Sequence, residues 1–463
     1  MHSASDTSWL SDGASAPAED QGGPGLLDRL AALLFYVAIA FLAFLGGAYV
    51  MLDDTFPSSM LRTAYLAGTA WMQKQTQSLD PLTTDLWREA RSADRGVTVH
   101  DAGSAFTGYT LYTSGDGAYA RLLAMDGGVI HEWRRPFSTV WSEDAAVKDP
   151  QPDDMIYFDK ARMLPNGELI AIYTAVGDTP WGYGMVKLDP RGEVIWSYLQ
   201  HAHHDFDVAA DGRVYVLTHE VTNEEIEHFE KLQRPRLDDF VVVLSPDGQE
   251  LKKVSLTHAM LRSRFKGLLY STPYFALGDP LHTNSVELID DAKAANFPYG
   301  EPGQVLLSFR EPGLVAVLDL ESETIVWATR GSWLGQHDPS LLPNGNILLF
   351  DNLGRFDEGN DAQVIEFDPA SLEIQWRYAG DREQPFESDV RSSAEPLPNG
   401  NRLITESDGG RLFEVTRDGR IVWEYVNPVR GGEGDSHIPV VSGGQRIAAN
   451  WLDPQFRESL RAP

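Results

Sequence analysis

The stretch HDPSLLPNGNILLFD, residues 337–351, joins a polar segment through a Pro-Asn-Gly turn to a strand of apolar residues. Three other stretches align with it on their glycine-containing turns: DKARMLPNG (159–167), HDFDVAADG (204–212) and SSAEPLPNG (392–400). A fifth stretch, HTNSVELID (282–290), keeps the spacing but not the glycine. An internal repeat of this kind indicates that one supersecondary unit is copied along the chain.

Each aligned stretch is followed by a second pattern, in which two apolar strands flank a short turn and the second strand ends in Trp or an aromatic pair. Asp, Pro and Gly between runs of alternating apolar residues are hairpin signals. Each unit therefore contains about four strands, which is typical of a propeller blade. Five copies and a degenerate one lacking Trp lie at 119–133, 184–198, 315–329, 364–378, 412–425 and 241–256. The sequence predicts an all-β fold, a six-bladed β-propeller.

The two ends of the repeat region allow two ways of closing the propeller. The tail SHIPVVSGGQRIAANW (436–451) resembles the first two strands of the unit whose outer hairpin lies at 119–133. Pairing of the two chain ends would close the ring and remove exposed sheet edges. Residues 97–114 could instead supply those strands, in which case seven blades would form.

The N-terminal part has a different composition. Residues 1–29 are rich in Ser, Ala, Gly, Pro and Asp, which predicts a disordered tail. Residues 30–52 carry no charge and are long enough to span a bilayer as a helix. This run starts further from the N-terminus than a cleaved signal peptide usually does, so we favour an uncleaved anchor. We expect a helical linker at 53–96 and the propeller domain at 97–463.

Charge and cysteine content restrict the location and the chemistry. Arg29 precedes the apolar run while Asp53 and Asp54 follow it, which favours a cytoplasmic N-terminus and a periplasmic or extracytoplasmic propeller at the inner membrane. The net charge of −30 argues against nucleic acid as a partner. The chain has no cysteine, which excludes disulfides, thiolate metal sites and cysteine nucleophiles.

The aligned stretches place one residue of each unit at the same structural position. In a propeller, the first strand of each blade lines the central channel, so these residues should face one axial region. The set comprises Asp159, His204, His282, His337 and Ser392. Three histidines at one position indicate a site for chemistry, although any one of them alone would more often be structural.

The contexts of these histidines resemble the arylsulfate sulfotransferase family, bacterial enzymes that move a sulfuryl group between phenols without a nucleotide donor. The motifs read HHD at 203–205, HTN at 282–284 and QHD at 336–338, with an arginine on the next strand in LLSFREPG. The stretch 391–428 also looks like the membrane-tethered branch of the family. The resemblance covers about residues 97–451.

The resemblance implies roles for six residues. His337 would be the nucleophile that is transiently sulfated, and Arg310, His204 and His282 would hold the sulfate oxygens. Asn284 would be a further donor and Thr283 a substrate-binding neighbour. Sulfuryl transfer places charge on equatorial oxygens, which positioned cations and hydrogen-bond donors stabilise. The implied partners are an aryl sulfate donor and a hydroxyl acceptor, with a homodimer as an option and no cofactor or metal.

Two departures and three alternatives accompany this interpretation. Well-studied periplasmic members of the family carry a cysteine pair that this chain lacks, and residues 223–239 and 261–279 form inserts that could cover the channel mouth.

The alternatives are a quinone-cofactor dehydrogenase, a three-histidine metal site and a non-catalytic, membrane-tethered binding or assembly propeller. The turns before Trp lack the Thr-Gly expected of the dehydrogenase.

Overall fold

The computed structural model describes residues 25–460 except 54, 59, 62–63, 66–79 and 356–360. The chain divides into two compact units, Met1–Tyr65 and Leu66–Pro463. The first contains the helix α1 (Leu26–Leu52), whose 27 residues are long and apolar enough to cross a membrane. The predicted apolar helix at 30–52 is thus present and begins at Leu26. Of the predicted disordered tail, residues 1–24 lie outside the described residues.

The predicted helical linker, 53–96, lies partly outside the described residues, which omit 66–79. Its C-terminal end is not helical. A short 3-10 turn (Pro81–Thr83) precedes the strand β1 (Trp87–Glu89), which pairs with β26 (His437–Pro439). The first strand of the propeller, β2 (Gly96–His100), follows directly. This part of the chain therefore belongs to the propeller surface.

Six blades form the second unit, as the repeats predict. Blade II contains β6 (Ile156–Met163), β7 (Leu169–Ala175), β8 (Gly182–Leu188) and β9 (Val194–Tyr198). Blade III contains β10 (Ala202–Val208), β11 (Val214–Thr222), β12 (Arg236–Leu244) and β13 (Glu250–Ser255). Blade IV contains β14 (Thr283–Leu288), β15 (Val305–Phe309), β16 (Leu314–Asp319) and β17 (Thr324–Thr329).

The remaining blades complete the ring. Blade V contains β18 (His337–Leu341), β19 (Ile347–Asp351), β20 (Gln363–Phe367) and β21 (Ile374–Ala379). Blade VI contains β22 (Ser393–Pro396), β23 (Arg402–Glu406), β24 (Arg411–Val415) and β25 (Ile421–Val426), with β2 as a fifth strand. Blade I contains β3 (Tyr109–Ser114), β4 (Tyr119–Leu123), β5 (Val129–Arg134) and β27 (Val441–Ile447).

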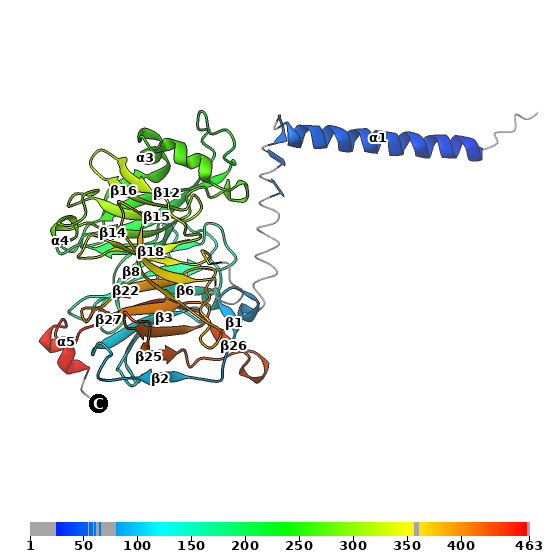
Figure 1. Ribbon diagram of the computed structural model, residues 1–463. Coiled ribbons are helices and arrows are strands. Elements are labelled where there is room, and N and C mark those ends of the chain that lie inside the picture. Colours follow the sequence, from blue (N-terminus) through cyan, green and yellow to red (C-terminus); the bar gives the residue numbers. More distant parts are fainter. Residues whose placement is uncertain are drawn as a thin grey trace, which may run out of the picture. The chain divides into compact units, whose positions relative to one another are not determined.

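Blade I closes the ring with strands from both ends of the propeller, and Figure 1 shows β27 beside β3. The C-terminal tail supplies only the inner strand β27, whereas β3 supplies the second strand. Residues 97–114 therefore do not form a seventh blade, because β2 extends blade VI and β3 joins blade I. Blade I thus holds strands from both ends of the propeller in one hydrogen-bonded sheet.

The tryptophans that end the outer strands join neighbouring blades. Their indole N–H groups donate to backbone carbonyls in a turn of the next blade. The pairs are Trp133 to Gly167, Trp196 to Pro246, Trp376 to Arg417 and Trp423 to Met125. A buried tryptophan needs such a partner for its polar N–H. The repeated Trp of the sequence is therefore a contact between blades.

Carboxylates on the inner strands join the blades at the channel. Each accepts a hydrogen bond from a backbone N–H of the next inner strand, which that edge leaves unpaired. The contacts are Asp205 Oδ2 to Val286 at 3.0 Å, Glu287 Oε2 to Leu341 at 2.8 Å and Glu395 Oε2 to Arg446 at 2.7 Å. These contacts join blade III to blade IV, blade IV to blade V, and blade VI to blade I at the channel.

Two inserts in blades III and IV pack on each other. Residues 223–235 form the connection between β11 and β12 and contain turns, so the helix-like pattern of this acidic insert does not form a helix. The helix α3 (Leu256–Arg262) and two 3-10 turns (Lys266–Ser271, Tyr274–Ala276) follow β13. Phe229 of the first insert and Leu277 of the second share one apolar cluster. Two other short helices are α4 (Asp291–Ala294) and α5 (Pro454–Ser459).

Candidate active site

A cavity of about 520 Å³ lies among the inner strands. Of the five residues at the repeated position, it is lined by Asp159, His204, His337 and Ser392. These side chains therefore face one region, as the repeat predicts. His282 does not line this cavity, but its ring lies 5.1 Å, centroid to centroid, from that of His204.

A local irregularity of the inner strands turns these residues toward the channel. The strand pairs β6–β7, β10–β11, β14–β15 and β18–β19 all shift register at or beside the repeated position. His204 and His282 have φ angles of 53° and 44°, and Asp338 has 51°. Such bulges re-aim side chains and are frequent beside active sites. The sequence repeat thus records a repeated bulge as well as a repeated turn.

His337, the first residue of β18, is held in one tautomer. Its Nδ1 lies 2.9 Å from the carbonyl oxygen of Gly335 and 2.8 Å from Oδ1 of Asn352. Both partners accept, so Nδ1 carries the proton and Nε2 keeps its lone pair. Asn352 is oriented by donating its amide N–H groups to the carbonyls of Ser388 and Arg391. Burial, followed by the charge of Arg310, lowers the pKa of His337 to about 3.

His282 is paired with an acid. It immediately precedes β14, and its Nδ1 contacts Oδ2 of Asp279 in a short ion pair. Burial acts to lower the pKa of His282, but the Asp279 carboxylate outweighs it and the pKa is raised. The ring of Trp181 stacks on His282 with 5.4 Å between centroids. His282 is thus the histidine of this group that favours the charged form.

Arg310 does not lie on a strand, contrary to the expectation from the motif. It occupies the turn between β15 and β16, and its backbone N–H donates to the carbonyl of His282 at 3.2 Å. Its guanidinium pairs with the neighbouring Glu311. After burial, the charge of Arg310 is the largest cause of the lowered pKa of His337. The turn therefore brings the arginine close to both histidines by a route other than an inner strand.

Thr283 and Asn284 are buried on β14. The amide nitrogen of Asn284 donates to the carbonyl of Gln336 at 2.8 Å, and Asn284 lines the cavity. Its Oδ1 and the hydroxyl of Thr283 have no hydrogen-bond partner among the described residues. The Thr283 backbone N–H donates to Oδ2 of Asp239 at 2.7 Å. Asn284 thus faces the cavity with its amide nitrogen already engaged.

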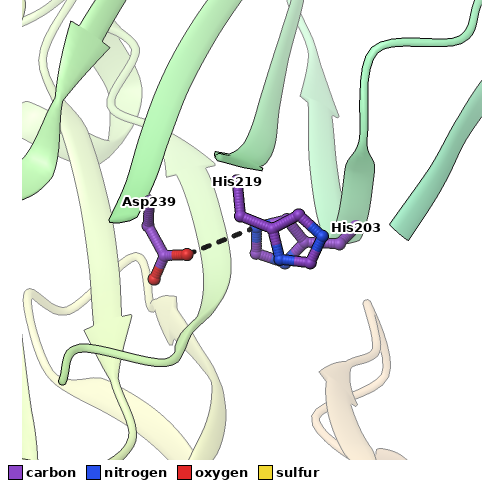
Figure 2. A group of neighbouring side chains, drawn as sticks. All are labelled: His203, His219 and Asp239. Atoms are coloured by element: carbon purple, nitrogen blue, oxygen red, sulfur yellow. Dashed lines mark ion pairs between the residues drawn. The ribbon is translucent and has the colours of Figure 1, made fainter. Parts of the chain in front are cut away.

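His203, His219 and Asp239 form a buried group whose potential ligand atoms lie within 4.8 Å of one another (Figure 2). The rings of His203 and His219 are stacked, with 4.3 Å between centroids and 21° between planes. A metal ion lies in the plane of each imidazole that binds it, so one ion cannot suit both rings in this arrangement. Nε2 of His219 also accepts the N–H of Gly182 at 3.3 Å, which leaves its proton on Nδ1. We assign no metal to this group.

His203 touches His204 directly. Their Nδ1 atoms lie 2.7 Å apart, although the two residues are adjacent on β10. Adjacent side chains of a regular strand point to opposite faces, but the left-handed backbone of His204 brings both rings together. Burial lowers the pKa of His203 to about 3 and lowers that of His204 well below its usual value. Both rings are therefore neutral near pH 7.

Lys160 connects three blades across the channel. Its Nζ lies 2.8 Å from Oδ1 of Asp205 and 3.1 Å from Oδ1 of Asp338. The two carboxylates hold the pKa of Lys160 above its usual value in spite of burial. The acids that follow His204 and His337 in the repeat thus bind a lysine and do not contact the histidines. Lys160 stands at the same repeat position in DKARMLPNG, which is the signal that could have revealed this cluster.

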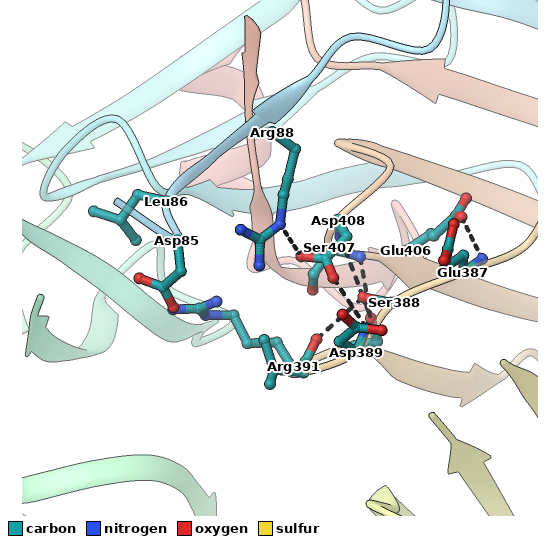
Figure 3. A network of polar contacts seen from close by, with 12 residues as sticks. Asp85, Leu86, Arg88, Glu387, Ser388, Asp389, Arg391, Glu406, Ser407 and Asp408 are labelled. Carbon is teal, nitrogen blue, oxygen red and sulfur yellow. Dashed lines mark hydrogen bonds and ion pairs between the residues drawn. The ribbon is translucent and has the colours of Figure 1, made fainter. Parts of the chain in front are cut away.

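Arg391 brings the N-terminal segment to the cavity wall (Figure 3). Its guanidinium lies 2.9 Å from Oδ2 of Asp85 and 3.2 Å from the hydroxyl of Tyr157. In the same network Arg88 of β1 lies 2.9 Å from Oδ1 of Asp408. Nothing in the repeats connects Asp85 with Arg391, because Asp85 precedes the repeats and the two residues are far apart in the sequence. The segment before the first blade, which contains Asp85 and β1, therefore contacts a residue that lines the cavity.

Comparisons with solved structures give distant similarities. One solved structure, a protein of unknown function from Bacteroides caccae, is 12% identical with a TM-score of 0.45, over 72% of this chain and 99% of that one. Another, virginiamycin B lyase from Staphylococcus aureus, is 12% identical with a TM-score of 0.38, over 74% and 88%. These similarities are too low to support an inference about activity. No curated protein gives a significant match.

The family comparison is specific. The family described as arylsulfotransferase (ASST) matches residues 160–428, which is more than half of the chain. The matched region includes blades II to VI, except for the first residues of β6 and the strand β2. The match contains His204, His282, Arg310 and His337. The chain belongs to the arylsulfotransferase (ASST) family.

Proposed function

We propose that the protein transfers a sulfuryl group from an aryl sulfate to a phenolic or other hydroxyl acceptor through a sulfated His337. The observation that carries this proposal is the fixed tautomer of His337. Gly335 and Asn352 hold the proton on Nδ1, so the Nε2 lone pair is available, and the low pKa keeps the ring neutral. A neutral imidazole with a held proton is the form that acts as a nucleophile.

The groups around His337 fit the charge that develops during transfer. As Nε2 attacks sulfur, the bond from sulfur to the aryl oxygen breaks and a phenolate leaves. Negative charge on the three remaining sulfuryl oxygens is stabilised by nearby cations and hydrogen-bond donors. Arg310 is a permanent cation, and Asp279 favours the charged form of His282. An acceptor phenol then attacks the sulfur and releases His337, which gives ping-pong turnover.

The location that we propose follows from α1. The helix anchors the protein in the inner membrane with its N-terminus in the cytoplasm, because Arg29 flanks one end and Asp53 the other. The propeller then lies outside the cytoplasm and meets small aryl sulfates there. The two inserts that contain Phe229 and Leu277 would act as a cover over the channel and contribute to the choice of acceptor.

The test is detection of the covalent intermediate. Full-length protein in detergent micelles is mixed with 4-nitrophenyl sulfate without acceptor, and peptides are analysed by mass spectrometry at neutral pH. We expect a gain of about 80 Da, the mass of SO₃, on the peptide containing His337, removed by added phenol. His337→Asn should lose the adduct and the turnover, while His258→Asn, at a histidine on α3 that pairs with Glu224, should keep both.

Two outcomes contradict the proposal. An adduct on a residue other than His337 would show that another group is the nucleophile. No adduct and no turnover with a panel of aryl sulfates would favour a non-catalytic propeller that binds or assembles with other molecules.

A further inference from the structure

A proton has to be supplied in one half of the proposed reaction and removed in the other. The leaving phenolate takes up a proton, and the acceptor phenol gives one up before its oxygen attacks the sulfated histidine. His337 cannot do this, because its Nε2 bonds to sulfur and its Nδ1–H is held by Gly335 and Asn352. A second acid–base group is therefore needed, and this inference rests on the function proposed above.

His204 is placed for that task. It lines the cavity together with His337, and its Nδ1 contacts Nδ1 of His203, which leaves Nε2 as the ring nitrogen available to the cavity. One of the two Nδ1 atoms must carry the proton and the other must accept it. The protonation of His203 therefore decides whether His204 presents an N–H or a lone pair to the cavity.

Asp239 stands behind His203. Its Oδ1 lies 3.6 Å from Nε2 of His203. Figure 2 marks this contact with a dashed line. The His203 nitrogen has no hydrogen-bond partner among the described residues. The backbone of Thr218 also lies near His203 and acts to raise its pKa. The distance between Oδ1 of Asp239 and Nε2 of His203 has to shorten by about 0.6 Å to form a hydrogen bond. Long catalytic hydrogen bonds that tighten when substrate binds are common in structures without substrate.

We propose that Asp239, His203 and His204 form a proton relay that protonates the departing phenolate and deprotonates the incoming phenol. In the first half-reaction Asp239 gives its proton to Nε2 of His203. Nδ1–H of His203 gives its proton to Nδ1 of His204, and Nε2–H of His204 gives its proton to the phenolate oxygen. In the second half each proton moves back, starting with the phenol O–H. Asp239 and His203 are positioning residues here, and His204 is the group that touches substrate.

The relay needs no charged histidine at any stage. Both rings are neutral before and after each transfer, in agreement with the lowered pKa values of His203 and His204. The proton is stored on the carboxyl of Asp239, whose pKa is raised to about 7 by burial and by the charge of Asp279. Near neutral pH this carboxyl can therefore both give and take a proton.

Other titratable groups near the relay raise or lower the pKa values of His203 and His204. His219 on β11 stacks on His203, and His201, before β10, lies 5.8 Å from His219, ring to ring. The charges of His201 and His282 act to lower the pKa of His203, while that of Asp279 acts to raise it. His282, His337 and His219 lower the pKa of His204. None of these groups contacts Nδ1 of His203 in place of His204 among the described hydrogen bonds.

The test is the dependence on the leaving group, measured with full-length protein in detergent micelles. In ping-pong kinetics, kcat/KM for the donor reports the steps up to phenol departure. 4-Nitrophenolate leaves readily without a proton, whereas phenolate does not. We expect His203→Ala and Asp239→Asn to lower kcat/KM for phenyl sulfate by about 10²-fold and that for 4-nitrophenyl sulfate by less than about 3-fold. Asp239→Asn should also lose the limb of the pH–rate profile near pH 7.

Further variants separate a relay from a structural role. His219→Gln, at an equally buried histidine in the same stack, should leave the ratio between the two donors unchanged. His203→Gln preserves the volume of the buried side chain if His203→Ala fails to fold, and should show the same selective loss. In a double-mutant cycle, His203→Ala combined with His204→Gln should be no worse on phenyl sulfate than His204→Gln alone, because the two residues act as one unit.

An equal loss on both donors in His203→Ala and Asp239→Asn would overturn the relay while leaving the proposed transfer reaction intact. So would a metal ion bound stoichiometrically to the wild-type protein and lost in His219→Gln. Absence of any aryl sulfate turnover in the wild-type protein would instead remove the proposed function, and the relay with it.

Discussion

Oδ1 of Asn352 lies 2.8 Å from Nδ1 of His337, and this contact fixes which nitrogen of the histidine carries the proton. Rotation of the Asn352 amide by half a turn would break two hydrogen bonds, because its N–H groups donate to the carbonyls of Ser388 and Arg391. The orientation of the amide is thus imposed by the loop before β22. A partner of this kind holds the ring as well as its tautomer.

Asn352→Ala should lower kcat by about 10- to 100-fold, the usual cost of removing a group that orients an active-site histidine. The loss should be incomplete because the Gly335 carbonyl still accepts from Nδ1. Donor binding, measured in the His337→Asn background, should change little. Asn401→Ala, a buried asparagine in blade VI that binds Glu414, is the matched control and should keep kcat. Wild-type kcat in Asn352→Ala would argue against His337 as the nucleophile.

Arg310→Lys keeps the charge but loses the planar fork that matches sulfuryl oxygens. We expect kcat/KM for 4-nitrophenyl sulfate to fall by about 10²-fold, in line with the removal of one oxyanion donor. Arg330→Lys, at an exposed arginine of the same blade, serves as the control. Steady-state kinetics with unchanged kcat/KM in Arg310→Lys would show that the turn after β15 does not reach the reacting group.

Asp85→Ala should destabilise the propeller, because it leaves the guanidinium of Arg391 without its 2.9 Å partner. The Asp85 side chain is 46% exposed, so solvent screening limits the expected loss to about 1–2 kcal/mol. Thermal unfolding of full-length protein in detergent measures it. Glu89→Ala changes an exposed acid of the same segment and should have no effect. Equal unfolding midpoints for Asp85→Ala and Glu89→Ala would show that the contact of Asp85 with Arg391 does not contribute to stability.

The stability of the propeller should depend on pH through Glu395. Burial raises its pKa from 4.5 to about 7, so between these values the folded protein holds a proton that the unfolded chain has lost. Its contribution is full below about pH 4.5 and is lost as the pH rises through 7. Glu395→Gln stays neutral at every pH, so the variant's unfolding midpoint relative to wild type should rise between pH 4.5 and pH 8. A difference independent of pH would contradict this.

The orientation in the membrane can be tested with reporter fusions after Asp54 and after Pro463. Both should report a location outside the cytoplasm, because a single span of α1 with a cytoplasmic N-terminus carries everything after it across the membrane. A cytoplasmic signal from either fusion would refute the proposed orientation. A mature protein that starts near Tyr49 would show that the helix is a cleaved signal.

The blades and the repeated position follow from the sequence alone. Glycine turns, alternating strands and terminal tryptophans recur in the pattern of propeller blades, so a six-bladed propeller was predictable. The alternative of seven blades was excluded only by the pairing of β2 with blade VI and of β3 with blade I. The same spacing places His204 and His337 at one register, and both line the cavity. Local sequence determines these features because each depends on residues within one unit.

Contacts between residues of different strands and loops, within one blade or between blades, were decided by the tertiary structure. Asn352, which directly follows β19, binds His337 of the same blade, and Asp239 approaches His203 across blade III. Asp85, which precedes the repeats, contacts Arg391 of the loop before β22. Arg310 reaches the histidines from a turn, which the strand pattern could not indicate. The His203–His204 contact needs the left-handed φ of 53° at His204, where a regular strand would separate the two rings. The sequence determined which residues face the channel, whereas the contacts made on folding decided which protons those residues hold, because proton positions depend on partners that other strands and loops bring to each ring.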